Sequence, residues 1–142
     1  MQVKIKRIDK SFPLPQYETN GSVGVDLITR ADTIIEPKKI GLVPANVVVE
    51  VPVGYALILA SRSSTPLKKG LSTPHGIGII DHDYCGENDE LKIQVYNFTE
   101  EPITIKKGDK IAQGLFVRVD KVQFVEVEEM VSESRGGFGS TG

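Results

Sequence analysis

Cysteine, histidine and tryptophan are scarce in this chain. Its 142 residues contain one cysteine, two histidines and no tryptophan. The single cysteine, Cys85, excludes a disulfide within the chain, and two histidines argue against a Cys/His zinc site. This cysteine usage fits a reducing compartment.

Long hydrophobic runs and a strong positive charge are also missing. No stretch approaches the roughly 18 apolar residues of a membrane-spanning helix, and MQVKIKRIDK lacks the apolar centre of a signal peptide. We therefore expect a cytoplasmic protein with no membrane contact. The formal net charge of -2 argues against a broad nucleic-acid-binding face but leaves a locally positive pocket open.

Short β-branched runs separated by turn residues are what the chain does contain. They read VKIKRI, TIIE, NVVVEVP, YALILAS, GIGIID, LKIQVYNF, ITIK, GLFVRV and VQFVEVE. Many short strands at this spacing predict one all-β domain, a β-barrel or a sandwich. No window carries a helical stripe, and at most a single helical turn is expected near residues 65–69.

Polar residues gather in five segments, each beside a β-run. Arg62-Ser63-Ser64 offers a planar guanidinium and two hydroxyls suited to phosphate oxygens, or simply a turn with an exposed arginine. Asp81 ends an apolar strand and is either a turn cap or a functional carboxylate. Gln113 lies in an apolar strand, where its amide needs a hydrogen-bond partner from the protein or from a ligand.

The chain ends on SRGGFGSTG, a segment too rich in glycine to fold by itself. One interpretation is a solvated tail. The other is a flap that orders on a ligand with phosphates and a flat ring, where backbone N–H groups meet the phosphates and Phe138 meets the ring.

Taken together and in order, the five segments resemble the motifs of the trimeric dUTP diphosphatase (dUTPase) family. They are GVDL (24–27), RSS with GL (62–64 and 70–71), GIID with DY and G (78–81, 83–84 and 86), GD with IAQ (108–109 and 111–113), and R with FGSTG (135 and 138–142). The resemblance implies a distorted jelly-roll, a homotrimer with sites at subunit interfaces, a β domain over residues 1–134 and a flexible C-terminal lid over residues 135–142.

The implied reaction is hydrolysis of dUTP to dUMP and pyrophosphate with Mg²⁺, which would limit uracil in DNA and supply dUMP for thymidylate synthesis. Asp81 matches the carboxylate that orients and deprotonates the attacking water. Asp26 matches a carboxylate that reaches the metal through water, while the substrate phosphates hold most of the metal. The residues that match phosphate contacts are Arg62, Ser63, Ser64, Gln113, Arg135, Ser140 and Thr141.

The resemblance also assigns the recognition of base and sugar. Uracil would be read by main-chain groups around His75, Ile79, Ile80 and Lys92, a slot that rejects cytosine through unpaired polar groups. Tyr84 matches the residue packed under deoxyribose, which excludes a 2′-hydroxyl. In the lid, Phe138 matches the ring that stacks on uracil, beside Gly139.

Four features depart from the family pattern. Cys85 replaces a basic or long polar residue, the hairpin after it is about three residues longer, and Lys110 stands where arginine is more usual. Arg135 also lies closer to Phe138 than is common. A structural role for His75 stays open beside a ligand contact.

Two other functions stay open. A dCTP deaminase of the same fold, or a bifunctional enzyme, would share the RSS and ID segments but needs a carboxylate on the strand KIQVYN, where Gln94 stands. A non-catalytic nucleotide sensor or protein-binding module is the more remote alternative, because a fold alone does not fix a function.

Overall fold

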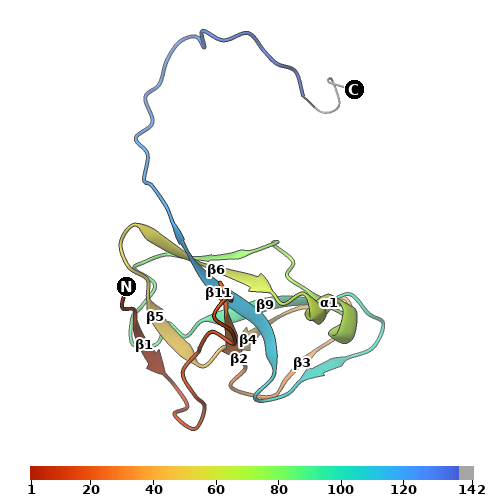
Figure 1. Cartoon of the computed structure of the whole chain (residues 1–142). Coiled ribbons are helices and arrows are strands. Elements are labelled where there is room, and N and C mark those ends of the chain that lie inside the picture. Colours follow the sequence, from red (N-terminus) through yellow and green to blue (C-terminus); the bar gives the residue numbers. More distant parts are fainter. Residues whose placement is uncertain (138–142) are drawn as a thin grey trace.

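The computed structural model describes residues 1–137 as short strands wrapped around one core, with one short helix (Figure 1). The strands are β1 (Lys4–Arg7), β2 (Val25–Ile28), β3 (Thr33–Ile35), β4 (Ile40–Pro44), β5 (Val47–Glu50), β6 (Tyr55–Ser61), β7 (Leu71–Ser72), β8 (Gly78–Ile80), β9 (Lys92–Asn97), β10 (Ile103–Ile105) and β11 (Lys110–Arg118). This confirms the all-β, jelly-roll-like prediction.

The strands form four antiparallel sheets that share the core. Their orders are β2-β11-β6-β8, β4-β9-β7, β1-β5 and β10-β3. Strand β9 shows why: Ile93, Val95 and Asn97 are buried and alternate with more exposed residues, so one face of the strand turns to the core. Buried Leu and Val side chains of β4, β5 and β6 complete the same cluster.

The helix α1 (Ser64–Lys69) confirms the single turn expected in this region. It ends because Gly70 has φ 65°, a left-handed conformation in which a Cβ would lie 2.3 Å from the Thr99 side chain. The buried Thr65 hydroxyl donates to the Ile111 carbonyl at 2.8 Å and fixes the helix to β11. The helix start therefore lies at the end of the four-stranded sheet.

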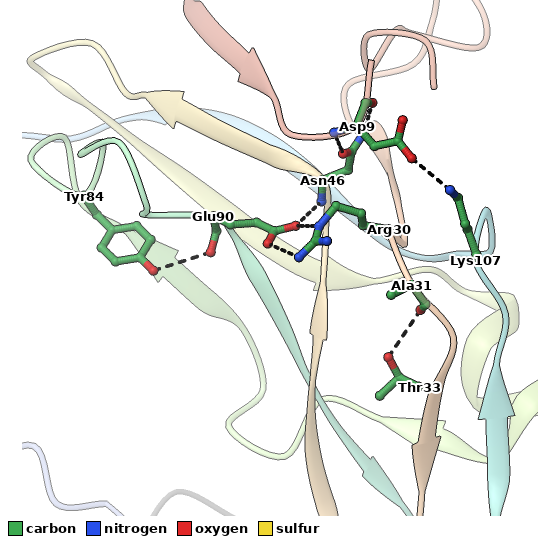
Figure 2. A network of polar contacts seen from close by, with 8 residues as sticks. All are labelled: Asp9, Arg30, Ala31, Thr33, Asn46, Tyr84, Glu90 and Lys107. Carbon is green, nitrogen blue, oxygen red and sulfur yellow. Dashed lines mark hydrogen bonds and ion pairs between the residues drawn. The ribbon is translucent and has the colours of Figure 1, made fainter. Parts of the chain in front are cut away.

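A polar network joins four loops of the chain (Figure 2). Arg30 donates to both oxygens of the buried Glu90 carboxylate at 2.8 and 2.9 Å, and the Asn46 N–H donates to it at 2.9 Å. Asn46 also donates to the Asp9 carbonyl at 3.0 Å. Burial raises the pKa of Glu90, but the hydrogen bonds from Arg30 and Asn46 outweigh it and hold that pKa below its ordinary value. The network fixes the end of the loop that precedes β9.

Two parts of the chain differ from the sequence-based expectation. Strands β2, β4 and β7 lie outside the predicted runs, and in β4 Gly41 and Pro44 weaken the strand pattern of IGLVP. The run VQFVEVE has the pattern of a strand, but residues 119–137 form no strand or helix, because no strand lies beside them. Figure 1 shows this segment leading away from the body after β11. Among residues 1–137 no helix is long and apolar enough to span a membrane.

Candidate active site

A cavity of about 420 Å³ opens where β2, the end of β6, the start of α1 and β11 meet. Four of the predicted site residues line it: Asp26, Arg62, Ser63 and Gln113. The remaining wall is the segment that precedes β2, contributing Glu18, Gly21, Ser22, Val23 and Gly24. Three of the five motif segments therefore meet at one place.

Asp26 and Gln113 face the same cavity because they are opposite each other on paired strands. Gln113 is in register with Asp26 on β2 and with Ala60 on β6. Its amide donates to the Ser61 carbonyl at 3.4 Å, so the half-buried side chain has the protein partner that the sequence required. A Cβ at Gly24 would lie 2.8 Å from the Gln113 amide oxygen, so glycine leaves the space that this side chain occupies.

Arg62 is held by an acidic partner and by the backbone. Its Nε lies 3.0 Å from Oδ1 of Asp26, a carboxylate whose side chain is only 11% exposed. Its second donor reaches the Lys110 carbonyl at 3.1 Å. The hydroxyl of the exposed Ser63 makes no capping hydrogen bond to α1, and the half-buried Ser64 is the first residue of that helix. A fixed cation and a free hydroxyl at a cavity wall can bind an anion.

Lys110 and Glu18 extend this pair into a chain of alternating charges. The Lys110 Nζ lies 2.5 Å from Oε1 of Glu18 and 3.4 Å from Oδ2 of Asp26. The hydrogen bond from Lys110 lowers the pKa of Glu18, and the same bond raises the pKa of Lys110. The order of charges is therefore Arg62, Asp26, Lys110, Glu18, with Lys110 lining a smaller neighbouring pocket that Asp26 and Glu18 share with the large cavity.

A second and much smaller pocket, about 20 Å³, lies between β6, β8 and β9. His75, Lys92 and Gln94 line it, together with Leu59, Thr73, Gly78 and Ile93. The structure thus brings together His75 and Lys92, which are far apart in sequence. Strand β8 is an edge strand, so every second residue of it presents its main-chain N–H and C=O on the side that β6 does not pair.

Asp81 and Tyr84 begin the loop that follows β8. Both are exposed, and the Tyr84 N–H donates to the Asp81 carbonyl at 3.4 Å, which closes a tight turn. The Tyr84 hydroxyl points back to the Glu90 carbonyl at 3.5 Å, as Figure 2 shows. The polar network of Glu90 therefore supports the ring of Tyr84 from behind.

Asp81 does not lie at the large cavity of its own chain. Ile80 pairs with Leu57, so Asp81 is level with Ala56, whereas Arg62 follows the other end of β6. Six residues of extended strand separate these two levels, a distance of about 20 Å. The structure therefore places the predicted site residues in two separate groups, called half-sites below: a cavity with Asp26, Arg62, Ser63 and Gln113, and an edge with His75, Asp81 and Tyr84.

The remaining predicted contacts belong to the C-terminal segment. Arg135 is exposed. Phe138, Gly139, Ser140 and Thr141 lie outside the described residues, and so does most of the predicted lid.

The donor set determines how a metal could be held. Within residues 1–137 no group of three or more histidine, cysteine or acidic side chains is placed to bind one. A protein cage for a metal is therefore not present in that part of the chain. Magnesium usually keeps several waters and is bound by one or two carboxylates plus substrate phosphates. Asp26, a nearly buried carboxylate on the large cavity, fits that kind of site.

Glu18 is a cavity residue that the sequence did not reveal. The segment YETNGS shows only the turn residues Asn20 and Gly21 just before the GVDL motif. Proximity to that motif is the one available signal, since nothing in the local pattern predicts that Glu18 reaches Lys110 on β11.

Comparison with known proteins gives a consistent picture. A family model described as dUTPase matches residues 10–142. The deoxyuridine 5′-triphosphate nucleotidohydrolase of Hydrogenobaculum sp. is 39% identical over 145 aligned residues, which cover 100% of this chain and 99% of that protein.

Two solved structures extend this similarity to the fold. A dUTPase from Streptococcus mutans has a TM-score of 0.77 at 31% identity, covering 84% of this chain and 98% of that one. A dUTPase variant of Staphylococcus bacteriophage 80alpha, solved with dUpNHpp, has a TM-score of 0.87 at 25% identity, covering 99% and 98%.

Proposed function

The chain belongs to the dUTPase family and is a dUTP diphosphatase, and we propose that it cleaves dUTP by in-line attack of water on the α-phosphorus with assistance from Mg²⁺. The observation that carries this mechanism is the large cavity, where a paired arginine, a free serine hydroxyl and a strand-borne amide surround a nearly buried carboxylate. These groups suit a triphosphate, whose hydrolysis needs positioning and charge stabilisation without a covalent intermediate.

The chain's own residues divide the work. Arg62, Ser63 and Gln113 hold phosphate oxygens, with Ser64 behind them at the start of α1. Asp81 orients a water and takes its proton as the bond between the α-phosphorus and the bridging oxygen breaks, so that pyrophosphate leaves. Asp26 would hold Mg²⁺ through water. When bound, this ion neutralises charge on the phosphates.

The separation of the two half-sites supports a homotrimer with shared sites. A carboxylate about 20 Å from the phosphate cavity cannot act on a nucleotide bound there by the same chain. A neighbouring copy that brings its Asp81 edge to this cavity completes the site, and rotational symmetry repeats the arrangement in every subunit.

The edge around β8 suits the recognition of base and sugar. Alternate main-chain groups of the edge strand β8, which contains Ile79 and Ile80, face its open side, and His75 and Lys92 line the adjacent small pocket. Fixed donors and acceptors can discriminate uracil from cytosine, because each buried mismatch costs about 1–3 kcal/mol. Tyr84, supported by the Glu90 carbonyl, would pack under deoxyribose.

The roles assigned to the C-terminal segment stay predictions. The lid over residues 135–142 would close on the bound nucleotide, with Arg135, Ser140 and Thr141 on the γ end and Phe138 on uracil. The domain boundary at residue 134, the cytoplasmic location and the roles in excluding uracil from DNA and supplying dUMP are equally part of this proposal.

Pyrophosphate release from dUTP, UTP, dTTP and dCTP, with and without Mg²⁺, tests the proposed reaction. We expect turnover of dUTP alone, and only with the metal. The variant Asp81→Asn should still bind dUTP but hydrolyse it at least about a thousandfold more slowly. Unchanged turnover would remove Asp81 from this role.

The deaminase alternative has a structural argument against it. Gln94 lies in the small pocket with His75 and Lys92, where a deaminase requires a carboxylate. A neutral amide cannot accept the proton, so we expect no ammonia from dCTP. Release of ammonia by the purified protein would instead favour a deaminase or a bifunctional enzyme.

A further inference from the structure

We propose that Glu18 is a positioning residue that holds the Lys110 ammonium away from Asp26 and so keeps the second oxygen of Asp26 available to the hydrated metal. The inference rests on the proposed function, because it concerns the same cavity. Glu18 has no role among the motif residues that resemble the family.

The geometry of the three side chains carries the first step. The Lys110 Nζ lies 2.5 Å from the Glu18 carboxylate but 3.4 Å from Oδ2 of Asp26. The other oxygen of Asp26 is already committed to Arg62 at 3.0 Å. Lys110 is therefore the one neighbour in direct competition for Oδ2 among these pairs, and Glu18 draws it off.

Exposure carries the second step. The Glu18 side chain is 56% exposed and Lys110 is 36% exposed, so their pair contributes little to folding stability. The Asp26 side chain is only 11% exposed, so its attraction to an ammonium in direct contact would be weakly screened by solvent. Such an ammonium would compete strongly with the hydrated metal for Asp26. The Lys110–Glu18 pair therefore determines the position of the Lys110 ammonium and contributes little to the stability of the fold.

If the position of Lys110 did not matter, the charge count would predict a change of nucleotide affinity in the opposite direction. The cluster of Arg62, Asp26, Lys110 and Glu18 is formally neutral, with two cations and two anions. Removing the charge of Glu18 alone would make the cavity more positive and attract an anionic nucleotide more strongly. Position and overall charge therefore make predictions of opposite sign for the affinity of the nucleotide, whereas both raise the Mg²⁺ requirement.

The variant Glu18→Gln separates the two. We expect the Mg²⁺ concentration for half-maximal hydrolysis of dUTP to rise about two- to fivefold, with turnover at saturating Mg²⁺ nearly unchanged. The affinity for dUpNHpp, measured by calorimetry at a fixed low Mg²⁺ concentration, should fall by a similar factor. The control Glu50→Gln removes a comparably exposed partner from the Lys4–Glu50 pair and should change neither quantity.

The double variant E18Q/K110M removes the competing ammonium and also returns the cluster to neutrality. It therefore tests the cause together with the fall in dUpNHpp affinity of E18Q, which overall charge does not predict. We expect it to restore most of the wild-type Mg²⁺ requirement. A normal or lowered requirement in E18Q, or a double variant as impaired as E18Q, would overturn the proposal.

A substrate-free measurement distinguishes this proposal from the function on which it rests. In a crystal structure of E18Q we expect the distance from Lys110 Nζ to Asp26 Oδ2 to shrink from 3.4 Å to below about 3 Å, the length of a charge-assisted hydrogen bond. An unmoved lysine refutes the positioning role even if dUTP is hydrolysed. A wild-type protein that neither hydrolyses dUTP nor binds dUpNHpp refutes the proposed function, whatever the lysine does.

Discussion

Two inactive variants should restore activity to each other when they share a trimer. Asp81→Asn removes the proposed base, and Arg62→Gln removes the guanidinium at the phosphate cavity. In one chain these positions are six residues apart along β6, or about 20 Å. Each defect should therefore lie in a different active site, even when both come from the same subunit.

The size of the recovery follows from symmetry. In a cyclic trimer each site takes position 81 from one chain and position 62 from its neighbour. A trimer with two copies of one variant and one of the other has a single junction where both positions are native, so about one site in three works. In a random equal mixture, three-quarters of the trimers are mixed, so we expect about one quarter of wild-type activity.

The assay uses two affinity tags, one on each variant, and co-expression. Sequential purification on both tags isolates mixed trimers, and pyrophosphate release from dUTP is compared with each parent. The control pairs Asp81→Asn with itself under the two tags and should stay inactive. If mixed trimers are no more active than their parents, Asp81 and Arg62 of one chain belong to the same active site. That outcome would contradict the separation inferred from the register of β8 on β6.

The remaining predictions concern packing at the cavity and the stability of the fold. Gly24→Ala should lower kcat/KM about tenfold, because the new Cβ meets the Gln113 amide oxygen at 2.8 Å; Gly21→Ala, where the space is open, should cost far less. Glu90→Gln should lower the unfolding free energy by about 2–3 kcal/mol, against under about 1 for the exposed Glu50→Gln. Because the pKa of Glu90 is depressed in the folded protein, its contribution to the unfolding free energy is present above about pH 4.5 and is lost as pH falls. Unfolding free energies of the wild type and of Glu90→Gln, measured by denaturant melts, should therefore converge in acid.

Local pattern is enough to predict the strands whose alternation faces one core. LKIQVYNF becomes β9 because Leu91, Ile93 and Val95 are apolar at alternate positions. The strand also has a neighbour on each side, β4 and β7. The same pattern does not predict strand β4, because Gly41 and Pro44 have a poor strand preference. The strand forms nevertheless because it pairs with β9. Tertiary pairing, which the sequence does not display locally, decides that element.

The site shows the same division between local and long-range information. The residue types at Arg62 and Ser63 suit phosphate oxygens or a plain turn, and Gln113 is a predicted phosphate contact only through the family resemblance. The fold brings the three side chains to one cavity. Their separation from Asp81 cannot be predicted from residue types, because it depends on the register of β8 against β6. The ion pair between Glu18 and Lys110 cannot be predicted either, because it requires a loop and a strand 92 positions apart in sequence to lie side by side.

The one failed strand prediction, VQFVEVE, leaves a group of apolar side chains uncovered in the single chain. Its apolar side chains are strongly exposed in the single chain, Phe124 by 95% and Val125 by 82%. Burying a side chain of this size is worth about 1.5–3 kcal/mol, so a free segment of this composition is unfavourable in water. The body presents a matching apolar groove of about 260 Å³ that includes Met1, Val3 and Ile5. The strand prediction is therefore wrong for the single chain, and we expect these exposed apolar side chains to lose solvent accessibility only when the proposed trimer forms.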